Sequence, residues 1–134
     1  LTMPILTVLV AAPRSATLTR DLAASLHERA VHTLHKRADL VAIAIQVVDP
    51  ADWVVAGRTL AEQGLRSAFV DIRITDETNT KDEKAAFVAQ VFADLQRLLG
   101  PLHEETYVHV HDVRAAAYGY GGRTQEARYQ DAVR

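Results

Sequence analysis

The sequence predicts an α+β fold in which two fused β-α-β units share one four-stranded mixed sheet, with both helices on the same face. Short runs with a strand pattern alternate with longer runs in which apolar residues recur every three or four positions, as in β-α-β units. The chain also repeats at a separation of 65 residues, where Trp53 pairs with Tyr118 and Gly57-Arg58-Thr59 pairs with Gly122-Arg123-Thr124. We therefore expect a single domain, 1–134, made of two repeats at about 4–64 and 65–125.

The first unit contains the more apolar strands. Residues 4–10 form a mostly apolar run, which predicts a strand buried on both faces. Apolar residues then recur every fourth position over 18–34, which predicts an amphipathic helix that begins at Ser15 or Thr17. A second apolar run at 41–48 predicts the strand that completes the unit.

The second unit has clearer local signals. Residues 69–75 alternate between apolar and polar, which predicts a strand with one buried face. Thr80 and Glu83 have the spacing of a capping box, so the next helix is expected to begin there. We expect it to end at Gly100 in the left-handed conformation. The run 106–113 alternates again and predicts the last strand.

The composition is that of a soluble globular domain and excludes several classes of function. The 134 residues are 49% hydrophobic with a net charge of −2, which argues against non-specific binding to nucleic acid or to an anionic membrane. The absence of cysteine excludes disulfide frameworks, thiolate nucleophiles and cysteine zinc sites. No apolar run approaches the roughly 18 residues of a membrane span, and no signal-like segment is visible, so we expect a cytoplasmic protein.

Both helices on one face of the sheet would leave the other face open. Apolar side chains on such a face favour self-association, so we expect an oligomer.

Pro4 and the segment 118–122 are two candidates for chemistry, and each also has a purely structural interpretation. Proline is tolerated as the first residue of a strand because no ladder hydrogen bond is lost there. The segment Tyr118-Gly119-Tyr120-Gly121-Gly122 fits a turn that needs positive φ. It lacks the lysine of a phosphate-binding loop, so nucleotide binding is given little weight.

His109 and His111 are the third candidate. In a strand they share one face with Tyr107, whereas Asp112 points to the other face. A His-x-His pair can begin a metal site, but a third ligand would be needed and no motif marks one. We favour a polar lining of a cavity or interface, and predict no metal.

Taken together, these features resemble the 4-oxalocrotonate tautomerase family. The resemblance rests on the Met3-Pro4 start, on Arg14 ten positions beyond the proline, and on the aromatic-Gly-x-Gly-Gly segment that begins at Tyr118. It covers essentially the whole chain, because the repeat matches longer members with two fused β-α-β units, similar in architecture to macrophage migration inhibitory factor. The resemblance implies a homotrimer with active sites between subunits and no metal or organic cofactor.

The resemblance also implies residue roles. Pro4, exposed once Met3 is removed, matches the catalytic base of the family, and Arg14 matches its substrate-carboxylate arginine. The aromatic wall residue of the family is matched by Tyr118 in the second unit and by Trp53 in the first. The chemistry is reasonable, because an α-amino group titrates near pH 7.7–8.0 and an apolar pocket penalises its cationic form. Such an amine can be neutral at physiological pH, as a general base must be. An arginine holds a carboxylate through two hydrogen bonds and so fixes the reacting carbon.

Two departures from the family pattern bear on the activity. The second arginine of the short tautomerases is matched by Ala42 in the first unit and by Tyr107 in the second. Tyr107, with His109 on the same face, is expected to line the substrate pocket and to donate a hydrogen bond to an enolate oxygen. The decarboxylases and dehalogenases of the family place paired arginines after the third strand, and the loop 75–79 has none.

The function expected is therefore cofactor-independent keto–enol tautomerisation of a small, carboxylate-bearing 2-hydroxy-dienoate or α-keto acid. One alternative is hydration, dehalogenation or decarboxylation on the same scaffold. Another is a non-catalytic trimeric protein of this fold in which Pro4 is blocked by the residues before it. No nucleic-acid or membrane partner is expected.

Overall fold

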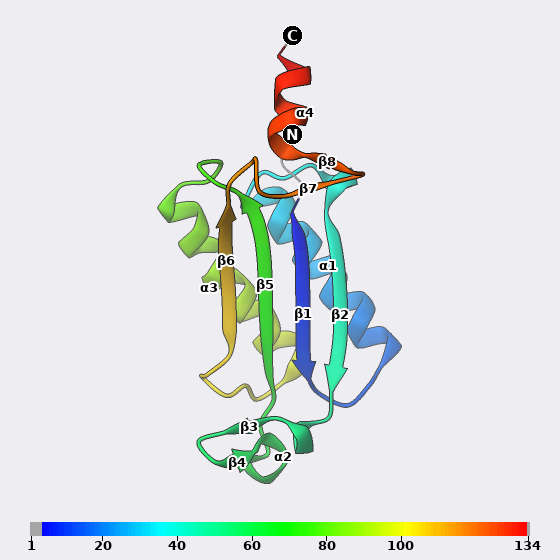
Figure 1. The fold of residues 1–134 in the computed structure, drawn as a ribbon. Helices are drawn as coiled ribbons and strands as arrows, with labels where there is room; N and C mark the ends of the chain where they lie inside the picture. The colour runs from blue at the N-terminus through cyan, green and yellow to red at the C-terminus, as the bar shows by residue number, and fades with distance from the viewer. Residues whose placement is uncertain (1–3, 134) are drawn as a thin grey trace.

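The computed structural model describes residues 4–133, and its centre is a four-stranded mixed sheet in the order β2-β1-β5-β6 (Figure 1). The strands are β1 (Ile5–Ala11), β2 (Ala42–Val48), β5 (Ser67–Thr75) and β6 (Tyr107–Val113). Within each unit the two strands are parallel, as a helical crossover requires, whereas the central strands β1 and β5 are antiparallel. The ends of β5 and β6 therefore meet the beginnings of β1 and β2 at one end of the sheet.

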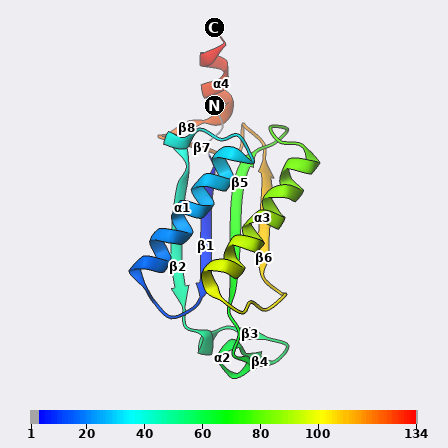
Figure 2. The same ribbon diagram turned by 180° about the vertical axis from the view of Figure 1, so that it is seen from behind.

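Both crossover helices, α1 (Ala16–His32) and α3 (Lys81–Leu99), cover the same face of the sheet (Figure 2). Each helix begins at a residue whose side-chain hydroxyl accepts a hydrogen bond from a free backbone N–H of the first turn. Ser15 caps α1, and Thr80 with Glu83 forms a reciprocal capping box on α3. Within residues 4–133 no helix combines the length and apolarity needed to cross a membrane. The large side chains buried between helices and sheet are Leu6, Val8, Val10, Leu22, Leu26, Leu34, Val70, Ile72, Ile74, Phe87, Val91, Leu95 and Leu99.

Short elements occupy the two ends of the sheet (Figure 1). They are β3 (Val54–Val55), β4 (Arg58–Thr59), α2 (Leu60–Gln63), β7 (Gly119–Tyr120), β8 (Arg123–Thr124), α4 (Gln125–Ala132) and the 3-10 turns η1 (Ala38–Leu40) and η2 (Pro50–Asp52). The hairpin β3–β4 and the hairpin β7–β8 lie at opposite ends. Each is followed by a short helix whose first turn is capped by a threonine, Thr59 or Thr124.

The face of the sheet opposite α1 and α3 carries no other element of residues 4–133 (Figure 1). Its side chains form rows across the strands, and the middle row runs from Ala44 through Thr7 and Asp71 to His109. Large side chains at its margins are exposed, with Ile5 at 46% and Tyr107 at 54%. Association through this face stays a prediction.

The predicted α+β class, the mixed sheet and the placement of both helices on one face are confirmed. Element boundaries agree within two residues; β5, for example, begins at Ser67 rather than at position 69. The prediction for Gly100 is wrong in one respect. Its φ of 88° is positive but its ψ of −145° lies outside the left-handed helical region. Pro101 follows, and a residue before proline is kept out of helical ψ values by the proline ring.

Candidate active site

A small cavity opens at the end of the sheet where β1 begins and the β7–β8 hairpin closes over it. Its volume is about 200 Å³, and its walls are mostly apolar. The lining residues are Pro4, Ile5, Leu40, Ala42, Tyr118, Gly119 and Tyr120. Residues 114 positions apart in the sequence, Pro4 and Tyr118, thus share one cavity because the antiparallel pairing of β1 with β5 brings the start of one unit to the end of the other.

Pro4 is buried at the first position before β1. Its carbonyl oxygen accepts a hydrogen bond of 3.2 Å from the backbone N–H of Ala42, so it is fixed by the pairing of β1 with β2. A proline ring at this position costs no ladder hydrogen bond. Met3, whose removal the predicted mechanism requires, lies outside the described residues.

Tyr118 is part of the cavity wall, and hydrogen bonds hold both its side chain and its backbone in place. Its hydroxyl and the Thr75 hydroxyl are 2.6 Å apart, and its carbonyl oxygen accepts a hydrogen bond of 2.9 Å from the backbone N–H of Gln125. Burial raises the pKa of the Tyr118 phenol, while hydrogen bonds to Thr75 and Gln125 act in the opposite direction. The phenol is therefore a hydrogen-bonding group that stays protonated at neutral pH.

The β7–β8 hairpin supplies the rest of this wall. Gly121 and Gly122 both have positive φ, as the tight connection between the two strands requires. The guanidinium of Arg128 lies 3.8 Å from the centre of the Tyr120 ring and donates a hydrogen bond to the Tyr120 carbonyl oxygen. The helix after the hairpin thus holds the second tyrosine of the cavity in place.

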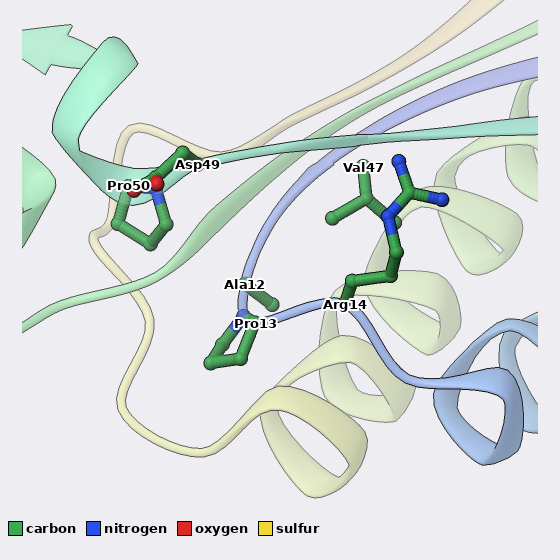
Figure 3. Close-up of a pocket in the computed structure, with 6 residues that line it drawn as sticks. All are labelled: Ala12, Pro13, Arg14, Val47, Asp49 and Pro50. Atoms are coloured by element: carbon green, nitrogen blue, oxygen red, sulfur yellow. The ribbon is translucent and has the colours of Figure 1, made fainter.

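Arg14 lies at the other end of β1, beside a larger cavity of about 470 Å³ (Figure 3). The lining residues are Ala12, Pro13, Arg14, Val47, Asp49 and Pro50. A strand rises about 3.3 Å per residue, so the seven residues of β1 separate this cavity from Pro4 by roughly 20 Å. A single chain therefore does not bring Arg14 to Pro4.

Tyr107 and His109 lie on the open face of the sheet and outside the Pro4 cavity of the same chain. Tyr107 begins β6 at the end far from Pro4, and its hydroxyl donates to Glu105 at 2.8 Å. The pKa of Tyr107 is raised, mainly because of this hydrogen bond to Glu105.

His109 belongs to a polar cluster in the middle of the open face. Its Nδ1 is 3.8 Å from a carboxylate oxygen of Asp71, and its ring stacks on that of His111 with centroids 5.5 Å apart. Asp71 also pairs with Arg73 at 3.4 Å. Among the described residues, no three His, Asp or Glu side chains are arranged to hold a metal ion.

Sequence reasoning missed several residues near the candidate site. Tyr120 lies in the glycine-rich segment that was singled out, and the alternation of residues 69–75 places Asp71 on the face of His109, so both had a signal. Leu40, in the 3-10 turn before β2, had none. Neither did Lys36, a lysine with only 4% of its surface exposed.

Comparison with known proteins bears on the fold. No protein-family model and no curated protein matches the sequence. Solved structures do match, over more than nine-tenths of the chain. A native fused 4-OT gives a TM-score of 0.80 at 20% identity, and the match covers 92% of this chain and 97% of that chain. The Q0 fused 4-OT, a wild-type symmetric trimer, gives 0.75 at 20% identity, covering 92% of this chain and 98% of its own.

Two other proteins match in the same way. Pt0534, solved after inactivation by 2-oxo-3-pentynoate, gives a TM-score of 0.80 at 17% identity and covers 92% of this chain and 98% of its own. A macrophage migration inhibitory factor-like protein from Entamoeba histolytica gives 0.72 at 18% identity, covering 91% of this chain and 98% of its own. The chain therefore has the α+β tautomerase fold that fused 4-OT shares with macrophage migration inhibitory factor-like proteins.

Proposed function

We propose that the protein is a cofactor-independent tautomerase that transfers a proton within a small 2-hydroxy-dienoate or α-keto acid, with Pro4 as the acid and base. The observation that carries the proposal is the apolar cavity formed by Pro4 and Tyr118 in a chain with the tautomerase fold. The cavity is small and has two tyrosines, Tyr118 and Tyr120, in its wall. These properties suit a small conjugated acid.

In this proposal the reacting group is the secondary amine of Pro4, set free when Met3 is removed. Apolar walls disfavour the cationic amine and so lower its pKa, which keeps a neutral base available near neutral pH. The amine takes the proton from the hydroxyl oxygen of the dienol and returns it to a carbon of the conjugated chain, which leaves a 2-oxo acid. Atoms balance without a further reactant, so the step needs no cofactor.

The substrate carboxylate needs a cation, and we propose that it is Arg14 of a neighbouring copy in a homotrimer. Arg14 is exposed and lies roughly 20 Å from Pro4 in its own chain, a distance that no side chain spans. Tyr107 and His109 lie on the open face, where a second copy would meet the sheet. A trimer would therefore allow all of these side chains to act on one substrate, and fused 4-OT is itself trimeric.

The direct test compares two forms of the protein, one beginning at Pro4 and one retaining Leu1-Thr2-Met3, each verified by intact mass. The Pro4-started form should ketonise 2-hydroxymuconate or phenylenolpyruvate, and the longer form should not, because its Pro4 nitrogen is an amide without basicity. 2-Oxo-3-pentynoate should add to the free amine and increase the mass of the Pro4-started form alone. Equal activity of both forms would remove Pro4 from the mechanism, and inactivity of both would favour the non-catalytic alternative.

The sharing of the site between subunits has its own test. Pro4-started Arg14→Gln and the longer form with Arg14 intact should each be inactive alone. After joint refolding, random mixing should restore activity at about a quarter of the sites, where a free Pro4 meets a neighbouring Arg14. If Arg14 acted within its own chain, the mixture would stay as inactive as its components.

A further inference from the structure

Lys36 is a buried lysine close to the cavity end of the sheet, in the turn between α1 and β2. Only 4% of its surface is exposed. His35, directly before it, has a φ of 60°, in the left-handed region that few non-glycine residues adopt. This conformation turns the chain so that Leu34 and Lys36 are both buried while His35 stays exposed. The backbone therefore directs the lysine inward.

The Lys36 ammonium begins a chain of hydrogen bonds that ends at the candidate active site. Its Nζ donates to Thr78 Oγ1 at 3.1 Å, and Thr78 Oγ1 donates to the carbonyl oxygen of Thr75 at 2.6 Å. The hydroxyl of Thr75 is in turn 2.6 Å from that of Tyr118, which lines the cavity with Pro4. Two threonines thus connect the buried cation to the aromatic wall.

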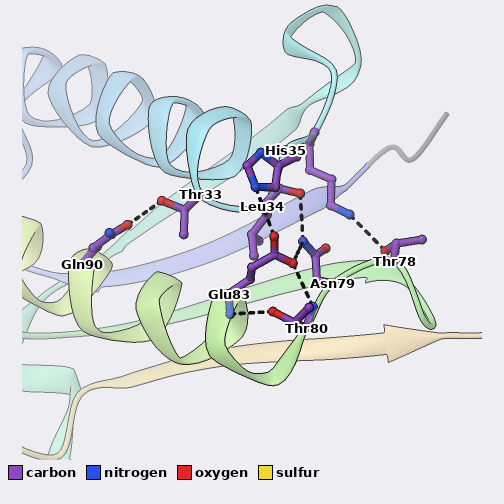
Figure 4. Close-up of polar contacts among 9 residues, drawn as sticks. Thr33, Leu34, His35, Thr78, Asn79, Thr80, Glu83 and Gln90 are labelled. Atoms are coloured by element: carbon purple, nitrogen blue, oxygen red, sulfur yellow. Dashed lines mark hydrogen bonds and ion pairs between the residues drawn. The ribbon is translucent and has the colours of Figure 1, made fainter.

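The loop that carries Thr78 is tied to the same turn by further contacts (Figure 4). The Asn79 side chain donates to the Leu34 carbonyl oxygen at 2.9 Å and to Glu83 at 3.2 Å. Glu83 also pairs with His35 at 3.1 Å. The turn after α1 and the loop after β5 therefore form one connected polar cluster, in which Lys36 has a fixed acceptor.

We propose that Lys36 is a positioning residue that, through Thr78 and Thr75, holds the Tyr118 hydroxyl in the wall of the Pro4 cavity. It acts on the end of β5: by orienting the Thr78 hydroxyl toward the Thr75 carbonyl, it fixes the backbone from which the Thr75 side chain reaches Tyr118. The proposal rests on the proposed function for its catalytic meaning, but its structural content concerns Tyr118 alone.

The test follows the Tyr118 phenol by NMR in protein labelled with ¹³C at the tyrosine Cζ, with Tyr118→Phe used for assignment. Thr75→Val removes the direct partner and should change the Tyr118 signal and raise its pKa further. Lys36→Met and Thr78→Val should shift both in the same direction, although neither residue contacts Tyr118. Thr33→Val is the matched control, because its hydroxyl bonds to Gln90, away from this chain of contacts.

The two variants keep the test decisive if one of them folds poorly. A Tyr118 signal that stays at its wild-type position and pKa in whichever of Lys36→Met and Thr78→Val folds would overturn the proposal. A separate measurement is the rate of ketonisation by the Pro4-started forms. We expect a lower kcat in both Lys36→Met and Thr78→Val than in wild type. If wild type shows no ketonisation while Tyr118 responds, the proposed function fails and the positioning role stands. If wild type is active but the Tyr118 signal does not respond in the variants, the positioning role fails and the proposed function stands.

Discussion

Gly119→Ala should reduce ketonisation at least about 100-fold while the four-stranded sheet and its two helices stay folded, because a shift of 1 Å in a catalytic wall can have an effect of this size. An added Cβ at Gly119 would lie 1.8 Å from the carbonyl oxygen of Arg123 and 2.6 Å from the Thr124 Cα. Both atoms are backbone of the paired strand β8, so neither can rotate away. The hairpin must open, and Tyr118 and Tyr120 must move with it.

The first repeat offers a matched control for this change. Position 54 corresponds to position 119 at the 65-residue separation, and it carries a valine in the β3–β4 hairpin, paired with Thr59 as Gly119 is paired with Thr124. Val54→Ala should leave ketonisation unchanged. Far-UV circular dichroism should match wild type in both variants, and trypsin should cleave faster after Arg123 only in Gly119→Ala. A Gly119→Ala enzyme with wild-type kcat/KM would show that the hairpin does not form the working wall.

The parts of the fold that the sequence predicted well are those with local causes. The capping box at Thr80 and Glu83 and the apolar periodicity of the helices depend on neighbours within one turn. The predicted left-handed conformation of Gly100 was wrong in its ψ angle, although the cause, the proline that follows it, is local too. The sheet is mixed because each unit contributes a parallel pair of strands and the two pairs are joined by the antiparallel pairing of β1 with β5.

The candidate site was harder to predict, because it depends on contacts between distant segments. The meeting of Pro4 with Tyr118 follows from strand order and not from any spacing in the sequence; only the family resemblance pointed to both. The same resemblance grouped Arg14 with Pro4, and the structure puts them at opposite ends of β1. The strand predicted over 4–10 already implies that distance, because a strand rises about 3.3 Å per residue. The sequence does not show which copy supplies the arginine that meets a given Pro4.

Lys36 is the clearest case of a residue that sequence reasoning could not find. Lysines are almost always exposed, and its neighbours His35 and Arg37 are exposed polar residues. Its burial results from the left-handed turn at His35 and from the loop after β5 that covers it. That burial has a measurable consequence for stability.

The free energy of unfolding should rise with pH between about pH 8 and about pH 10.5, and Lys36→Met should abolish most of that rise. Burial lowers the pKa of Lys36 to about 8 from an ordinary value of 10.5, and Glu83 and Asp112 only partly oppose the shift. Between these two values the unfolded chain binds more protons than the folded chain, so raising the pH favours folding. A shift of this size corresponds to at most about 3 to 4 kcal/mol.

At neutral pH the methionine variant should be as stable as wild type or more stable, since it no longer buries a cation, and replacing a buried charge with an apolar side chain is often neutral or favourable. The two nearby carboxylates keep other partners, His35 for Glu83 and Lys84 for Asp112 at 2.7 Å.

Lys81→Met, at an exposed position on α3, is the control and should retain the wild-type slope. Urea unfolding at a fixed protein concentration measures all three proteins. A slope in Lys36→Met equal to that of wild type would mean that Lys36 titrates outside this range. If instead the slope disappears while Tyr118 is unaffected, the lysine is buried for stability alone, and its role in the cavity wall is refuted.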